Sequence, residues 1–148
     1  MTSDNPLIRL TYVSEHNLAA DRGGFHPAFG AIEATSVRRN TQEDITGFLI
    51  CARTWFAQIM EGPQEAVDRL YARLETDPRH HALRLVSREA VDRRLFPDWA
   101  MALGHFSDTT RMVFASLDFA PEAPPEPRQD GDLIELAADL AAIKRVAR

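Results

Sequence analysis

The sequence predicts an α+β domain of the ferredoxin-like class: the order βαββαββ, a mixed sheet, two helices on one face, and further helices at the C-terminus. Three observations predict it. Five segments have the alternation or the β-branched and aromatic content of strands. Two segments between them repeat apolar residues every three or four positions, as amphipathic helices do. The length of 148 residues suits one hydrophobic core, so we expect one domain with an appendage.

The first strand and the first helix are predicted within residues 7–40. Residues 7–14 favour a strand and alternate from Leu10 onward, and the Gly and Pro content of residues 15–27 is typical of a loop. In residues 28–40 the spacing places four side chains on one helical face: Phe29, Ile32, Ser36 and Asn40. Ser36 and Asn40 are polar, so they either bond nearby backbone groups or face a ligand.

A hairpin is predicted next, with strands at residues 44–52 and 54–60 joined by a tight turn near Arg53. The second strand is apolar on both faces, which is typical of a central strand that is covered on both sides. Gln58 is then a buried amide, and burying an amide without partners costs about 1–3 kcal/mol. Its partner is a backbone carbonyl, a water molecule or a polar ligand.

The rest of the predicted core is one helix and two strands. Residues 64–77 have the apolar spacing of an amphipathic helix, and Tyr71 falls within that pattern as a core residue. Residues 83–91 and 99–104 predict the fourth and fifth strands, separated by a turn at residues 96–98.

The C-terminal part predicts three further segments: a short helical extension at residues 107–119, a Pro-rich linker at 120–131 and an amphipathic helix at 132–148. One face of that last helix carries Leu133, Leu136, Leu140, Ile143 and Ala147. We expect this face to dock on its own domain, on a second copy of the chain or on a partner.

Composition and motifs exclude several classes. The net charge of −5 disfavours direct nucleic-acid binding, which normally requires an excess of Lys and Arg. A single Cys51 permits neither an intramolecular disulfide nor a cysteine metal cluster. No secretory signal, membrane-spanning run or common catalytic motif is present in the sequence. We therefore expect a soluble, cytoplasmic protein that is not an enzyme and holds no metal.

One set of polar residues makes chemical sense together. If the first and third strands are neighbours, Tyr12 faces Gln58, and Ser36 and Asn40 lie above them on the first helix. A phenol, two amides and a hydroxyl under two helices form a slot that can hydrogen-bond a flat polar heterocycle. A phenol can also donate an electron and a proton.

Five motifs, in order along residues 7–103, resemble those of the BLUF family, blue-light sensors that use a flavin. The motifs are Arg9–Ser14; Ser36 and Asn40 with Ile45–Gly47; Phe56 and Gln58 with Glu61–Pro63; Asp77–His80; and Phe96–Trp99 with Met101. Each motif alone is weak, whereas their shared order and spacing are specific.

The resemblance implies FAD, bound without a covalent bond between the two helices. The implied binding residues are Tyr12, Ile32, Ser36, Asn40, Phe56, Gln58, Arg79 and His80, the last two near the ribityl and phosphate portion. Light would drive electron and proton movement from Tyr12 and leave Gln58 in an altered tautomer or orientation, newly bonded to the flavin C4 carbonyl. Trp99 and Met101, on the fifth strand, would exchange places and carry the signal onward.

The resemblance also implies a short, stand-alone member of the family. Residues 1–106 would be the photosensor domain, and output would be a change of oligomeric state or of binding to an unknown protein partner. The alternative is a flavin-free ferredoxin-like interaction module, in which the same polar residues satisfy one another.

Overall fold

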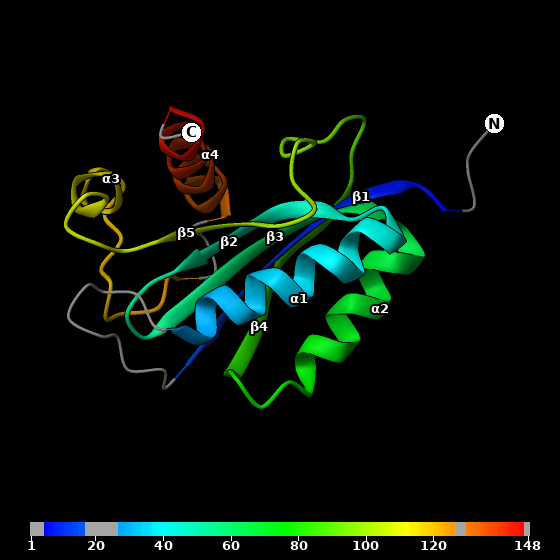
Figure 1. The fold of residues 1–148 in the computed structure, drawn as a ribbon, viewed down its shortest axis with the longest axis horizontal. Helices are drawn as coiled ribbons and strands as arrows, with labels where there is room; N and C mark the ends of the chain where they lie inside the picture. The colour runs from blue at the N-terminus through cyan, green and yellow to red at the C-terminus, as the bar shows by residue number, and fades with distance from the viewer. Residues whose placement is uncertain (1–4, 17–26, 127–129, 147–148) are drawn as a thin grey trace.

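The computed structural model describes residues 5–16, 27–126 and 130–146, and its elements follow the expected order (Figure 1). The elements are β1 (Leu7–Glu15), α1 (Pro27–Glu43), β2 (Thr46–Cys51), β3 (Trp55–Pro63), α2 (Gln64–Glu75), β4 (His81–Ala90), β5 (Ala102–His105), α3 (Arg111–Ser116) and α4 (Asp130–Val146). The ferredoxin-like α+β class predicted from the sequence is confirmed. Parts of the predicted N-terminal loop and of the Pro-rich linker lie outside the described residues.

The sheet has the order β4-β1-β3-β2-β5, with β3 at its centre. β1 pairs antiparallel with both β3 and β4, β2 pairs antiparallel with β3, and β2 pairs parallel with β5. Every residue of β3 before Pro63 is buried, as the expectation of a central, doubly covered strand requires. The register places Gln58 opposite Tyr12 on one side and opposite Leu49 on the other.

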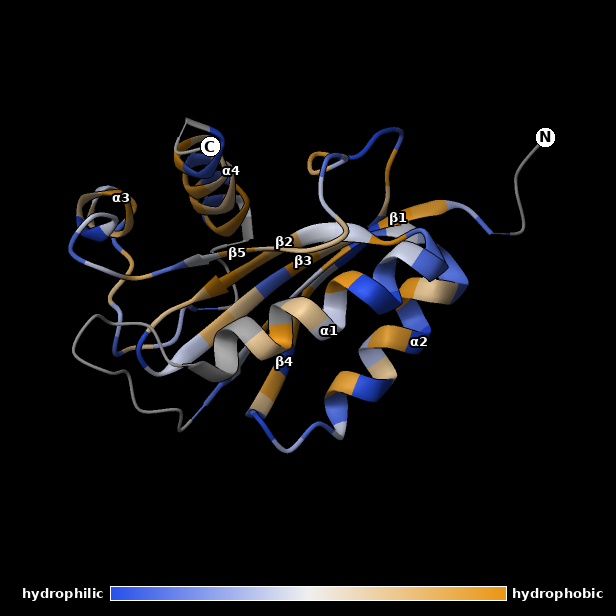
Figure 2. Ribbon diagram, viewed as in Figure 1, coloured by the Kyte–Doolittle hydropathy of each residue, from blue (hydrophilic) through white to orange (hydrophobic). Residues whose placement is uncertain are grey.

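Helices cover both faces of the sheet. α1 and α2 lie on one side, and α3 and α4 lie on the other (Figure 1). Alternation along β3 divides its side chains between these layers, because successive residues of a strand point to opposite faces. Trp55, Ala57 and Ile59 join the core under α3 and α4, whereas Phe56 and Met60 face α1 and α2. The apolar strands between two helical layers stand out in Figure 2.

The C-terminal helix docks on its own domain, one of the three options left open by the sequence. Five side chains on one face of α4 are buried in the core: Leu133, Leu136, Ala137, Leu140 and Ala141. Gly104 on β5 allows this close approach. A Cβ atom at that position would lie 2.8 Å from the ring of Phe48 and 3.1 Å from Cβ of Leu140.

The part of the Pro-rich segment that precedes residue 127 packs against the β2–β3 turn. The backbone N–H groups of Arg53 and Thr54 donate to the carbonyl of Pro121, and the Trp55 indole donates to the carbonyl of Ala120. Pro125 is buried. Residues 120–126 therefore pack on the domain, because their carbonyls accept hydrogen bonds from donors on the turn.

A buried carboxylate fastens the β4–β5 connection to the sheet. Glu61 is fully buried near the end of β3 and accepts a hydrogen bond of 2.9 Å from Nε of Arg9. It also accepts bonds of 2.8 Å from the backbone N–H groups of Leu95 and Phe96. Such charge-assisted bonds are strong, so they fix the chain just before Trp99.

Trp99 and Met101 lie in the segment that precedes β5, which begins at Ala102. The expectation that both residues belong to the fifth strand is therefore wrong. The reason is visible in the hydrogen bonds. The carbonyl of Trp99 accepts from the N–H of Gly47, and the carbonyl of Ala100 accepts from the side chain of Asn40. Because these two carbonyls accept bonds from Gly47 and Asn40, the directions of the Trp99 and Met101 side chains do not follow the alternation of a strand.

Within the described residues, no helix is both long and apolar enough to cross a membrane. The same residues contain no group of three or more His, Cys, Asp or Glu side chains arranged to hold a metal ion.

Substitution of Leu136 by Ala should lower the free energy of unfolding by about 2–5 kcal/mol, because Leu136 is fully buried between α4 and the sheet. Chemical denaturation measures this loss. Glu135→Ala is the matched control, since Glu135 is the exposed neighbour on the same helix and its loss should change stability by less than about 0.5 kcal/mol. Equal effects of the two substitutions would contradict the docking of α4.

Candidate functional site

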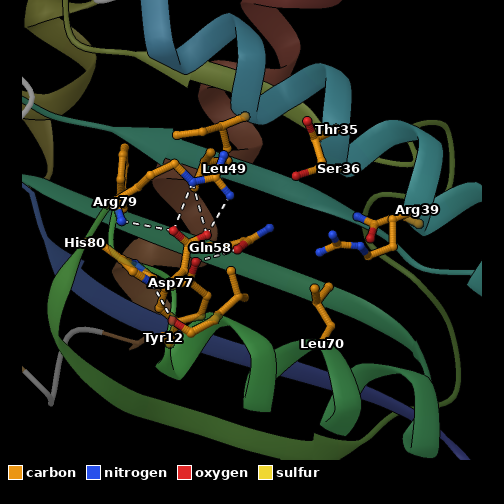
Figure 3. A pocket seen from close by; sticks show the side chains of 14 residues that line it. Tyr12, Thr35, Ser36, Arg39, Leu49, Gln58, Leu70, Asp77, Arg79 and His80 are labelled. Atoms are coloured by element: carbon orange, nitrogen blue, oxygen red, sulfur yellow. Dashed lines mark hydrogen bonds and ion pairs between the residues drawn. The ribbon is translucent and has the colours of Figure 1, made fainter.

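A cleft lies between α1 and α2, with β1 and β3 as its floor (Figure 3). Its enclosed cavity is small, about 40 Å³, and the cleft measures about 550 Å³ when the part open to solvent is counted. All eight residues expected to bind the cofactor line it: Tyr12, Ile32, Ser36, Asn40, Phe56, Gln58, Arg79 and His80. The cleft is therefore narrow, and it gathers the residues singled out by the sequence.

The floor of the cleft holds a hydrogen-bonded chain of three side chains. The Tyr12 hydroxyl donates to Oε1 of Gln58 over 2.6 Å, and Nε2 of Gln58 donates to Sδ of Met101 over 3.4 Å. All three residues are buried. A thioether sulfur is a weak acceptor, so the Gln58 amide makes one strong bond and one weak bond within the protein. A ligand that offers a better acceptor can therefore compete for Nε2.

Burial raises the pKa of the Tyr12 phenol far above its ordinary value, and nearby Cys51 and Asp77 raise it further. The phenol therefore keeps its proton across the physiological pH range. A protonated phenol donates to an acceptor, which is why it faces the carbonyl oxygen of Gln58. Tyr71 of α2 stacks on Tyr12 with ring centroids 6.0 Å apart, which confirms its predicted place in the core.

Asn40 connects the cleft to the segment before β5. Its Nδ2 donates to the carbonyl of Ala100 over 2.8 Å. Its Oδ1 is buried and has no hydrogen-bond partner among the residues that the structure describes. A buried acceptor without a partner is costly, so Asn40 presents an open acceptor to any donor that enters the cleft.

Arg79 and Asp77 form an ion pair inside the cleft. Nε and Nη2 of Arg79 contact both carboxylate oxygens of Asp77, and the backbone N–H of Arg79 also donates to Oδ1 (Figure 3). The hydrogen bonds from Arg79 hold the pKa of Asp77 below its usual value, and the same pairing raises the pKa of Arg79. Asp77 therefore neutralises the positive charge of Arg79, a residue that the family resemblance placed near the phosphate portion of FAD.

His80 bonds to the protein through both ring nitrogens. Nε2 lies 2.6 Å from the carbonyl of Leu74, and Nδ1 lies 2.7 Å from the hydroxyl of Ser14. A carbonyl oxygen can only accept, so Nε2 carries a proton, and in the neutral imidazole Nδ1 then accepts from the Ser14 hydroxyl. The imidazole meets the Tyr12 ring edge-on, with centroids 6.0 Å apart. In this arrangement His80 supports Tyr12 from the side.

The structure separates the two residues assigned to signalling. Met101 lies on the cleft side against Gln58, within the core cluster that contains Phe56. Trp99 lies in the core cluster on the opposite side, where its ring centroid is 6.1 Å from that of Phe48. Met101 is therefore the one of the two that faces the cleft.

Six further cleft residues were not assigned from the sequence: Thr35, Arg39, Leu49, Leu70, Leu74 and Asp77. Leu70 and Leu74 belong to the apolar face of α2. The spacing of apolar residues on a helix is the same whether that face packs on a core or on a ligand, so it could not identify them as cleft residues. Leu49 could have been found from the hairpin register, which places it beside Gln58. Asp77 stood within a quoted motif, but its pairing with Arg79 depends on the local turn.

Comparison with known proteins identifies similar sequences. The family profile described as "BLUF: Sensors of blue-light using FAD" matches residues 7–102. The chain is 38% identical over 101 residues to the photoactivated adenylate cyclase subunit beta of Euglena gracilis, a match over 68% of this chain and 11% of that protein. It is 46% identical over 44 residues to the blue light- and temperature-regulated antirepressor BluF of Escherichia coli K12, covering 30% of this chain and 11% of the antirepressor. The chain thus spans about a tenth of these relatives.

Solved structures share the fold. The dark-state structure of BlrB, described as a BLUF protein, superposes with a TM-score of 0.70 at 28% identity, covering 91% of this chain and 97% of that one. The photo-activated state of BlsA gives a TM-score of 0.72 at 23% identity, covering 90% of this chain and 94% of that one, a likeness of fold.

Stability should fall as the pH rises above about 10, the ordinary pKa of tyrosine, because Tyr12 ionises in the unfolded chain while burial holds its pKa far higher in the folded protein. The unfolded state then binds fewer protons, so a loss of about 1.4 kcal/mol is expected by pH 11. Urea unfolding at pH 9 to 11 should show this fall in the wild type and a much smaller one in Tyr12→Phe. Tyr71→Phe should reduce it less, since Tyr71 is only partly buried. An unchanged slope in Tyr12→Phe would contradict the assignment.

Proposed function

Because the chain belongs to the BLUF family of blue-light sensors that use FAD, we propose that it binds FAD in the cleft between α1 and α2 and that Tyr12 and Gln58 form its light-driven switch. The observation that carries this proposal is the 2.6 Å hydrogen bond from the buried phenol of Tyr12 to the amide of Gln58 on the cleft floor.

The donor and acceptor groups of the cleft fit a flavin ring. Oδ1 of Asn40 is a buried acceptor without a partner among the described residues, and a ring N–H would satisfy it. Among the described residues Nε2 of Gln58 has only the thioether of Met101 as acceptor, and a ring carbonyl or ring nitrogen would be a better one. Side chains fill much of the narrow cleft, so FAD binding requires α1, α2 or the Asp77–Arg79 pair to move aside.

A bound flavin would supply absorption of blue light and, once excited, a strong affinity for an electron. Tyr12 would give up an electron, and its proton would leave along the existing hydrogen bond to Oε1 of Gln58. When the electron returns, the phenol would take back either the same proton, which leaves Gln58 as a rotated amide, or a proton released from Nε2, which leaves Gln58 as the imidic-acid tautomer. No product forms, so the cycle returns to its starting state in the dark.

Output would pass through the segment before β5. Two side chains of the cleft hold this segment: Gln58 through Met101, and Asn40 through the carbonyl of Ala100. A rotated Gln58 would point its carbonyl oxygen at Met101 and lose the contact. The signal would reach the helical layer formed by α3 and α4 and change binding to a protein partner or to a second copy of the chain.

An absorption spectrum of the purified chain, supplied with FAD and recorded before and during blue illumination, tests the proposal. A bound flavin spectrum that shifts to longer wavelength in the light and recovers in the dark is expected. A colourless protein of normal stability would favour the alternative, an interaction module without flavin.

Tyr12→Phe and Gln58→Leu should each retain FAD and lose the light-induced red shift, since one removes the electron and proton donor and the other removes the amide that switches. Difference absorption spectra during illumination measure this. Tyr71→Phe is the matched control, because Tyr71 stacks on Tyr12 yet makes no bond to Gln58, and it should keep the shift. A normal photocycle in Tyr12→Phe would overturn the mechanism.

A further inference from the structure

The last turn of α4 contacts the segment before β5 from the side opposite to the cleft. The guanidinium carbon of Arg145 lies 4.7 Å from the centroid of the Trp99 ring, and Nη2 lies 3.4 Å from a carboxylate oxygen of Asp98. One residue earlier on α4, Nζ of Lys144 donates to the carbonyl of Leu103 over 3.2 Å. Two adjacent cations of one helix therefore hold both ends of residues 98–103.

The same six residues are held from the cleft side by Asn40 and Gln58. Asp98 and Trp99 contact α4, and the next two residues, Ala100 and Met101, are bonded to side chains of the cleft. Because Trp99 and Met101 are separated by one residue, neither can exchange faces without moving the other.

The Arg145 contact is suited to hold an indole in place. Trp is the strongest aromatic partner for a cation, and a guanidinium can stack flat on the ring. Trp99 is only 7% exposed, whereas the Arg145 side chain is 45% exposed, so the cation covers the indole on its solvent side. Its position in the last helical turn also suits the helix dipole, which favours cations there.

We propose that Arg145 is a positioning residue that holds Trp99 against α4 while Met101 contacts Gln58, and so couples the docking of α4 to the light-driven switch. The proposal rests on the proposed function. A partner that displaces the end of α4 would remove the contact between Arg145 and Trp99, so the light-adapted state should then decay as it does in a variant that lacks this contact. The contact that such a partner would regulate is the one between Arg145 and Trp99.

The chain offers a matched control. Arg53 lies 5.2 Å over the ring of Phe106 and pairs with Glu122 at 3.0 Å, which repeats the arrangement of a cation over an aromatic ring with a carboxylate partner. Arg53 stands on the β2–β3 turn and makes no bond to residues 98–103 in the described structure. Arg53→Gln thus removes the same chemistry from a place unconnected with the switch.

The test compares Arg145→Gln, Arg145→Lys and Arg53→Gln as full-length proteins loaded with FAD. The rate of dark recovery after a blue pulse is the first measurement, and we expect Arg145→Gln to slow it about two- to fivefold, since the contact that draws Trp99 back is lost. Arg145→Lys keeps a cation and should lie closer to the wild type. Arg53→Gln should recover at the wild-type rate.

The second measurement needs no illumination. The chain has two Trp residues, so its NMR spectrum holds two indole N–H signals, and that of Trp99 should shift in Arg145→Gln but not in Arg53→Gln. Recovery in Arg145→Gln equal to that in Arg53→Gln would overturn the proposal. A wild type without any light-induced shift would instead overturn the proposed function. Thermal unfolding of each variant confirms that α4 and the domain remain folded.

Discussion

The amide of Gln58 is the constraint on which this arrangement depends. It lies on the central strand of a sheet covered on both faces, where a polar group is largely shielded from water and must find partners in the protein or in a ligand. Tyr12 and Met101 supply those partners from opposite sides of β3. The amide thereby links β1, β3 and the chain before β5, so a rotation of the Gln58 side chain would change bonds to both of the other two segments.

Charge in and around the cleft is arranged so that the proposed switch, Tyr12 with Gln58, carries no formal charge. Asp77 pairs with Arg79, and Glu61 binds Arg9 and two backbone N–H groups away from the cleft. Tyr12, Gln58 and Asn40 carry no formal charge. Proton transfer between neutral groups in a dry site is sensitive to small changes of geometry, because water cannot screen or replace a lost hydrogen bond. Rigid support by His80 and Tyr71 around the phenol serves that requirement.

Local patterns in the sequence predicted the helices, the strands and the cleft. They did not predict the contacts between side chains that are far apart in the chain. Alternation along the first and third strands predicted that Tyr12 faces Gln58, and helical spacing placed Ser36 and Asn40 above them. The same alternation failed at Trp99 and Met101. In a strand, residues two apart share a face, whereas here bonds from Gly47 and Asn40 set the backbone. No pattern indicated that Glu61 binds Leu95 and Phe96 or that Arg145 covers Trp99, since those pairs are far apart in the chain.

The two outer strands of the sheet determine how copies of this protein can meet. β4 carries Arg84, Arg88 and Glu89 along an edge, and β5, at the other edge, is only four residues long. Charged residues and short strands both disfavour edge-to-edge pairing, which otherwise joins sheets into open-ended aggregates. In the proposed output, helical surfaces would be exposed and covered again through many light cycles without the sheets of neighbouring copies pairing at their edges.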